Sequence, residues 1–287
     1  MPRTRVFHVD SKDRVNSSGA SDNFYVSFPV TQDIKGTAKL LSCNIPISYY
    51  PIDSHNNVID FQENVGAAVA ATITPGVYTP IELATEIKTR MDAASPNTRT
   101  YTVSYNSNTA KYTIAISAGT FTLLFSSGVN AVNSANRALG FPASDIATGA
   151  SQTSEYVIDI SGPKYLLIKS NALYASGTDP QGEQSNTNVN DGAVLSKINM
   201  NGNFGEVITY VDTGVPESYS VDTKTLRRID FYITDHNNRR VSLNGHDWDL
   251  DLMVVECPCG NGQNYMSDNT RQKYTNMMEG KQCGCGN

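Results

Sequence analysis

The sequence predicts an all-β protein, a sandwich or barrel that carries one or two short helices. Runs rich in β-branched and aromatic residues recur along the 287 residues, and turn residues separate them at the intervals expected of such folds. The chain is 39% hydrophobic but only 17% charged. Its surface must therefore be rich in Asn, Ser, Thr and Gly, a bias typical of turn-rich β proteins.

The strand-like runs extend over most of the chain. Before the predicted helix they lie at 5–9, 23–29, 37–47, 57–62 and 68–73, and after it at 101–105, 111–116, 121–126, 155–160, 164–170, 193–200, 206–211, 226–234, 240–244 and 248–256. No shift in composition marks a boundary before residue 256. We therefore expect one domain over residues 1–256 with an exposed polar loop near 175–191, and a cysteine-containing tail over 257–287.

The strongest local signal is a helix that begins after Thr79. Thr79 is a favourable N-cap, Pro80 occupies the first helical position, and Glu82 completes a capping box. An apolar stripe with a spacing of four residues follows, formed by Leu83, Ile87 and Met91. This pattern predicts a helix from about Pro80 to Met91 that covers one edge or end of the sandwich.

Two further local patterns follow the helix. Two alternating runs around a polar Asn-Ser-Asn-Thr turn predict a hairpin over residues 101–116. A second short helix is expected from Asn133 to Leu139, with Gly140 as the residue that ends it.

Charge and hydropathy exclude several classes of function. The net charge of −6 argues against a nucleic-acid coat and against a polybasic membrane binder. The N-terminal residues have no apolar segment typical of a secretory signal, and no run of about 18 apolar residues predicts a membrane span. We expect a protein that stays in a cytoplasm-like compartment, without direct membrane insertion.

Catalytic motifs are missing from the sequence. It contains no G-x-S-x-G, P-loop, G-x-G-x-x-G or H-E-x-x-H pattern. No two of the histidines, His8, His55, His236 and His246, are spaced as metal ligands on one face. The sequence therefore predicts no catalytic residues, no cofactor and no enzymatic activity.

The most acidic pattern is the alternation HDWDLDL at 246–252. In a strand, Asp247, Asp249 and Asp251 share one face, and Trp248, Leu250 and Leu252 share the other. The carboxylates could face water or neighbouring arginines, bind a hard cation, or act in catalysis. Residues that could supply the opposite charge are Arg227, Arg228, Arg239 and Arg240.

The cysteines fall into two groups. Cys43 lies in an apolar strand and is expected to be a buried small hydrophobe. The other four form two C-x-C pairs in the tail, Cys257 with Cys259 and Cys283 with Cys285. They could be free or variably oxidised thiols, disulfides, or a zinc site.

An ordered series of motifs resembles the penton (vertex) proteins of large icosahedral double-stranded DNA viruses and virophages. The series contains SKDRV near the start, NFYVSF, NIPISYYPI at 44–52, PGVYTPIELATEI at 75–87, YTVSYN at 101–106, LGF at 139–141, SGPKYL at 161–166 and LNGHDW at 243–248. It covers roughly residues 8–255. The C-x-C tail and the long polar loop depart from the family pattern.

This resemblance implies a jelly-roll capsid protein that forms a homopentamer at the fivefold vertices of the virion. Its implied partners are further copies of itself and the major and minor capsid proteins, with assembly in the host cytoplasm. An alternative is a minor capsid protein, or a receptor- or carbohydrate-binding β module on the virion surface. A metal-dependent hydrolase that uses the Asp row is a third hypothesis.

Overall fold

The computed structural model describes residues 3–15, 20–27, 35–173, 193–213, 219–222 and 228–256. The chain forms two compact units, one made of residues 1–49 with 163–287 and the other of residues 50–162. The sequence led us to expect one domain over 1–256; the structure instead inserts a second unit into the first. The physical reason is that each unit has its own cluster of buried apolar side chains.

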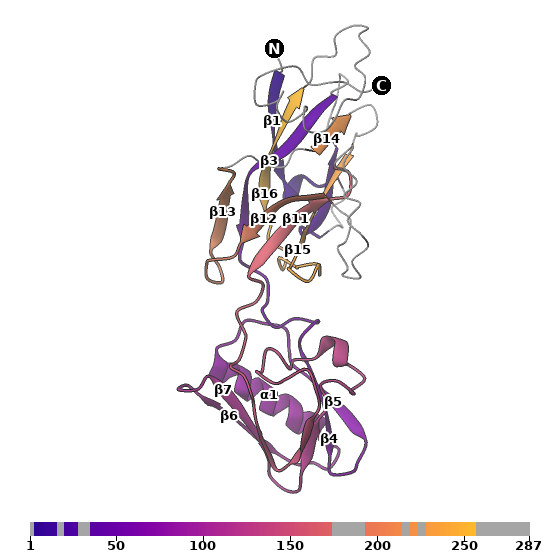
Figure 1. Ribbon diagram of the computed structural model, residues 1–287, viewed down its shortest axis with the longest axis vertical. Coiled ribbons are helices and arrows are strands. Elements are labelled where there is room, and N and C mark those ends of the chain that lie inside the picture. The colour runs from indigo at the N-terminus through magenta and orange to yellow at the C-terminus, as the bar shows by residue number, and fades with distance from the viewer. Residues whose placement is uncertain are drawn as a thin grey trace, which may run out of the picture. The chain divides into compact units, whose positions relative to one another are not determined.

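The first unit is an antiparallel sandwich of two sheets (Figure 1). The first sheet, here called the β16 sheet, has the order β1 (Arg3–Asp10), β16 (Asp249–Glu256), β3 (Lys35–Pro46) and β13 (Val207–Val211), and β14 (Tyr219–Asp222) also pairs with β3. The second, the β15 sheet, has the order β12 (Ala193–Asn199), β11 (Tyr165–Ser170), β15 (Arg228–Thr234) and β2 (Asn23–Ser27).

This strand order is that of a jelly roll. When β13 and β14 are counted as one interrupted strand, the described residues of this unit form eight strands, arranged 1-8-3-6 in one sheet and 2-7-4-5 in the other. Successive strands of the chain therefore alternate between the sheets at the start, as in a double Greek key. The predicted jelly-roll sandwich is confirmed, and the inserted unit lies between its third and fourth strands.

The core of the jelly roll follows from alternation along the strands. Trp248, Leu250 and Leu252 point inward and are at most 2% exposed, as the sequence predicted. The indole of Trp248 lies edge-on to Phe24 with ring centroids 5.7 Å apart, and its Nε1 donates to the carbonyl of Ser21 at 2.8 Å. This bond satisfies the polar atom of an otherwise apolar residue.

A β-bulge allows the long strand β3 to bury side chains in the core on both sides of the bulge. The register against β16 shifts at Leu41, so that Asp251 faces Ser42 while Leu252 faces Leu40. One extra residue reverses which side chains point inward. Ala38 and Leu40 are buried before the bulge and Cys43 and Ile45 after it.

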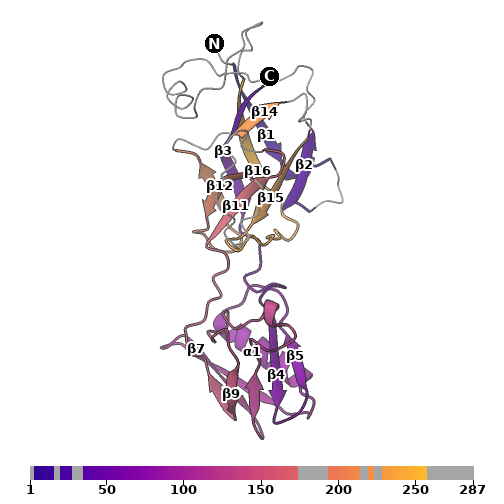
Figure 2. The same ribbon diagram turned by 45° about the vertical axis from the view of Figure 1, so that its right-hand side comes forward.

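The inserted unit contains two sheets and one α-helix (Figure 2). One sheet has the order β5 (Ala68–Thr72), β4 (Val58–Glu63), β8 (Phe121–Leu123) and β9 (Ile146–Gly149). The other has the order β10 (Ser151–Thr153), β7 (Lys111–Ile116) and β6 (Tyr101–Asn106). The β6–β7 pair confirms the predicted hairpin.

The predicted helix is α1 (Pro80–Ala94), and it belongs to this inserted unit. Thr79 and Glu82 form the expected reciprocal capping box. The stripe Leu83, Ile87 and Met91 is 0% exposed and packs into the core of the insertion. The helix therefore covers sheets of its own unit rather than an edge of the jelly roll.

Three local predictions differ from the structure. Residues 155–160 form no strand, and 240–244 contribute only an isolated bridge between Arg240 and Thr234. The segment around 133–139 is a 3₁₀ turn, η2 (Ala131–Asn133), followed by turns; another such turn is η1 (Ser11–Asp13). The amide of Ala135 donates to the carbonyl of Val58 at 2.8 Å, which ties this segment to β4 and interrupts the helix. Gly140, with φ of 76°, ends the last turn as expected.

The remaining sequence predictions concern the polar loop, the tail and membrane spans. The expected polar loop at 175–191 and the tail at 257–287 lie outside the described residues. Among the residues that the structure does describe, no helix has both the length and the apolar character required to cross a bilayer.

Candidate functional site

The acidic row predicted from the sequence lies on the outer face of the β16 sheet. Each carboxylate has its own donor from a neighbouring strand or turn. Asp249 accepts from Nδ2 of Asn44 at 2.8 Å, and Asp251 accepts from Oγ of Ser42 at 2.5 Å. Because Asn44 and Ser42 are uncharged, these two contacts satisfy hydrogen bonds without neutralising the carboxylates.

Asp247 lies just before β16, beside the turn that follows β1. It accepts from Oγ of Ser11 at 2.7 Å and from the guanidinium of Arg14 at 3.0 Å. The hydroxyl of Ser11 in turn accepts from the backbone N–H of Trp248 at 3.0 Å. Asp247 therefore fixes the start of β16 against β1, which is a structural role.

The arginines proposed as partners of the acidic row lie elsewhere. Arg228 stacks over the ring of Tyr25, with its guanidinium carbon 3.9 Å from the ring centroid, and Arg240 stacks over Tyr232 at 4.1 Å. The backbone N–H of Arg239 donates to Asp235. Arg227 lies outside the described residues. Sequence proximity was misleading because Arg228, Arg239 and Arg240 belong to the β15 sheet and the loop after it.

His8, Asp251 and Ser42 form a cross-strand row, but their order does not suit nucleophilic catalysis. The carboxylate of Asp251 lies between the other two side chains, in contact with Nδ1 of His8 on one side and Oγ of Ser42 on the other. In a catalytic triad the imidazole must lie between hydroxyl and carboxylate so that it can take the hydroxyl proton. The row therefore lacks the proton path of a hydrolase.

The candidate metal ligands of the Asp row do not come together as a metal site. Over the described parts of the chain, no group of three or more His, Cys, Asp or Glu side chains is arranged to hold a metal ion, and this includes Asp247, Asp249 and Asp251. The tail cysteines Cys257, Cys259, Cys283 and Cys285 lie outside those parts.

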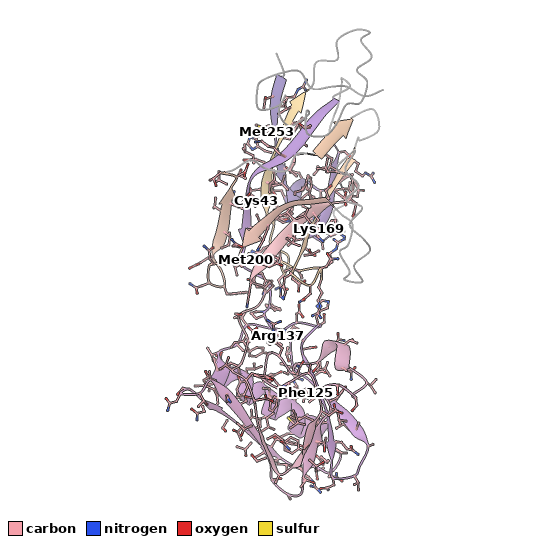
Figure 3. All side chains as sticks on the ribbon, viewed as in Figure 1. Cys43, Phe125, Arg137, Lys169, Met200 and Met253 are labelled. Carbon is pink, nitrogen blue, oxygen red and sulfur yellow. The ribbon has the colours of Figure 1, made fainter. Side chains whose placement is uncertain are left out.

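Cys43 is a free cysteine inside the jelly roll, on β3 (Figure 3). Cys43 is 1% exposed to solvent. Burial, with a smaller contribution from the negative charge of Asp249, raises the pKa of the thiol to about 12. The side chain is therefore protonated at neutral pH and acts as a small hydrophobe.

A buried carboxylate in the inserted unit was not found from the sequence. Glu63 of β4 accepts from the hydroxyls of Ser95 and Tyr101 at 2.6 and 2.9 Å and from Nδ2 of Asn97 at 2.9 Å. Burial by itself raises the pKa of Glu63, but the three hydrogen bonds and the charge of Arg99 outweigh it, so the pKa lies below its ordinary value. Nε of Arg99 lies 3.7 Å from the carboxylate.

This network joins the end of α1 to two strands of the insertion. Burial, together with the hydrogen bond to Glu63, raises the pKa of the Tyr101 hydroxyl well above its ordinary range. The donors come from residues 95–101, distant in sequence from Glu63, and no motif marks them. With every donor occupied by the carboxylate, the network acts as a structural hub.

A group of stacked cations is the other feature that sequence reasoning did not reveal. On the outer face of the β15 sheet, Lys197 lies over the ring of Tyr165 with its Nζ 4.2 Å from the centroid. It shares this face with the Arg228–Tyr25 and Arg240–Tyr232 pairs. The Arg228–Tyr25 pair joins β15 to β2, which are far apart in sequence, so only the fold brings these two side chains together.

Comparisons with known proteins gave one kind of match. No protein-family model and no curated protein matches the chain. Among solved structures, the chain is similar to the crystal structure of selenomethionine-labelled mavirus penton protein, with a TM-score of 0.45 and 11% sequence identity. The match covers 88% of this chain and 99% of that chain. The likeness concerns the fold alone.

Proposed function

We propose that this protein is a structural virion protein, a penton that forms a homopentamer and closes the fivefold vertices of an icosahedral capsid. The observation that carries the proposal is the eight-strand jelly roll, an architecture used by viral capsid proteins. Because one fold can host many functions, the topology needs a second, independent line of support. The ordered series of penton-like motifs over roughly residues 8–255 supplies it.

The chemistry of the candidate site favours a structural role over an enzymatic one. Each acidic side chain that the sequence singled out is hydrogen-bonded to a neighbouring strand or turn. The row of His8, Asp251 and Ser42 has the wrong order for acyl transfer. Under this proposal the partners are further copies of the chain and the major and minor capsid proteins of a double-stranded DNA virus, with assembly in the host cytoplasm.

The mass of the purified full-length protein in solution tests the proposal. Native mass spectrometry and sedimentation velocity over a range of concentrations should show a pentamer in equilibrium with the monomer. Labelling of the protein on purified particles should then place it at the vertices in electron micrographs. A protein that stays monomeric at capsid-like concentrations and never appears at vertices would overturn the proposal, and glycan binding by that monomer would favour the receptor-binding alternative.

A further inference from the structure

The strand β13 forms an open edge of the β16 sheet (Figure 1). Among the residues that the structure describes, β13 pairs with β3 alone, and no strand is hydrogen-bonded along its other side. An unpaired sheet edge presents a row of backbone N–H and C=O groups to which another strand can bind. The β16 sheet can therefore continue into another polypeptide chain at this edge.

The hydrogen bonds to β3 fix which backbone groups of β13 face outward. The N–H of Ile47 donates to the carbonyl of Glu206 at 2.8 Å, and the N–H of Asp212 donates to the carbonyl of Leu41 at 2.8 Å. The register between these two bonds is regular. Because bonded and non-bonded pairs alternate in an antiparallel ladder, every second residue of β13 turns its N–H and C=O away from β3. These residues are Val207, Thr209 and Val211.

The side chains beside this edge are uncharged and largely apolar. Val207 and Val211 are 59% and 56% exposed on the outer side of the sheet, and Thr209 between them is exposed as well. On the inner side, Ile208 and Tyr210 pack against the core but remain partly exposed. A further strand beside β13 would cover both sets of side chains, so its own residues should be apolar or β-branched on both faces.

The strand β13 lacks the features with which proteins protect an open sheet edge. Such features are charged side chains, prolines, bulges and very short strands. At the opposite edge of the same sheet, β1 carries Arg3, Arg5 and Asp10, and the edge strand β12 of the β15 sheet carries Lys197. The sequence of β13 is Val-Ile-Thr-Tyr-Val, and its register with β3 contains no bulge. This edge is therefore suited to pairing with a partner strand.

We propose that the open edge of β13 binds an extended segment of a different protein, which adds to the β16 sheet as a further strand. The row of N–H and C=O groups is complementary to another extended backbone, and this complementarity identifies the partner as a strand. The exposed valines, with the partly exposed Ile208 and Tyr210, favour a segment rich in Val, Ile and Thr. This inference goes beyond the proposed pentamer.

The two long segments of the chain outside the described residues lack a sequence of this kind. The cysteine tail at 257–287 contains no Val and no Ile, and the polar loop at 175–191 contains a single Val. Two copies of β13 paired antiparallel would form an isologous dimer, which the mass of the protein in solution detects. A different protein with a β-branched extended segment is therefore the occupant that the composition favours.

Peptide binding to the full-length protein tests the proposal. The probe is a synthetic peptide in which Val and Thr alternate over the length of β13, with lysines at both ends for solubility, and isothermal titration calorimetry measures its binding. The test variant is Thr209→Pro, because proline removes an outward N–H but no hydrogen bond to β3, so the sheet itself stays intact. The matched control is Thr209→Ala, which loses the side-chain bond to Asn44 but keeps the outward N–H.

We expect the peptide to bind the wild type and Thr209→Ala with similar affinity. It should bind Thr209→Pro at least about tenfold more weakly, because one donor is lost and the proline ring blocks the approach of the next strand. The same peptide with all backbone amides N-methylated should not bind the wild type. Val207→Lys with Val211→Lys should weaken binding, whereas Val65→Lys, at a residue of the inserted unit that is 97% exposed, should leave it unchanged.

Two results would overturn the proposal directly, namely no binding to the wild type or equal binding to the wild type and Thr209→Pro. Circular dichroism and Trp248 fluorescence show whether Thr209→Pro folds. Should it not fold, the double lysine variant and the N-methylated peptide decide. Sedimentation velocity without peptide is run on the same variants. If the wild type self-associates and folded Thr209→Pro does not, a second copy occupies the edge and the proposal is wrong.

Discussion

Replacement of Ile87 by Ala should destabilise the inserted unit selectively. Ile87 lies in the middle of α1 and is 0% exposed, packed in the core of that unit. The substitution deletes carbon atoms whose transfer contributes about 0.8 kcal/mol per methylene, so roughly 2.4 kcal/mol is lost from burial alone. The residual cavity brings the expected loss in the free energy of unfolding to about 3 kcal/mol, within the range of about 2–5 kcal/mol for core truncations.

The chain offers a separate spectroscopic probe for each unit. Its single tryptophan, Trp248, lies in the core of the jelly roll, while the α-helix of the described residues lies in the insertion. Thermal unfolding followed at 222 nm should therefore report chiefly on the insertion, and tryptophan fluorescence on the jelly roll. For a unit of this size, about 3 kcal/mol corresponds to a fall of roughly 10 °C in the midpoint at 222 nm.

The matched control is Ile81→Ala, the same substitution on the same helix. Ile81 is 71% exposed, so its truncation should change the stability by no more than about 0.5 kcal/mol. An unchanged midpoint at 222 nm in Ile87→Ala would refute the packing of α1. Equal shifts of both probes would show that the two cores do not unfold independently.

Three further predictions concern the buried and acidic groups. Glu63→Gln should lower the free energy of unfolding by about 1–3 kcal/mol, because an amide nitrogen would face donors that now share a carboxylate. Since the pKa of Glu63 is lowered in the folded state, the stabilisation by its carboxylate is complete above the ordinary value of 4.5 and is lost as the pH falls. The midpoint at 222 nm should therefore fall less steeply with acid in the variant than in the wild type. Millimolar Mg²⁺ or Ca²⁺ should leave the midpoint of Trp248 fluorescence unchanged, because Asp249 and Asp251 are bound by protein donors; a saturable rise would instead indicate a cation site. Cys43, with a thiol pKa of about 12, should resist alkylation at pH 8 until the protein unfolds. Peptide mass mapping measures this, and modification of Cys43 in the native protein would contradict its burial.

Local patterns predicted the elements well where a single segment decides the outcome. The capping box and apolar stripe of α1 act within a few residues, so the sequence alone located the helix. The inward face of Trp248, Leu250 and Leu252 follows from alternation, and it was predicted for the same reason. The helix expected at 133–139 was wrong because an amide of that segment bonds to a distant strand, which no local pattern records.

Features that depend on distant strands were beyond the sequence. The partners of the Asp row, Asn44 and Ser42, come from β3, whose register against β16 changes at a bulge. Without that register, Arg228, Arg239 and Arg240 were reasonable candidates, but the structure places them elsewhere. The stacking of Arg228 on Tyr25 and the donors around Glu63 likewise join segments that only the folded chain brings together.

The inserted unit shows why domain boundaries can be hard to find in such a chain. The boundaries fall at Tyr50 and Gly162, each directly beside a proline, Pro51 and Pro163. Closing a loop of this length costs the jelly roll little, because the entropic cost grows only with the logarithm of loop length. The ordering of the insertion itself is stabilised by its own core, so composition stays uniform across both boundaries. A jelly roll can thus accept a whole folding unit between its third and fourth strands while its strand order, and with it both outer faces, is preserved.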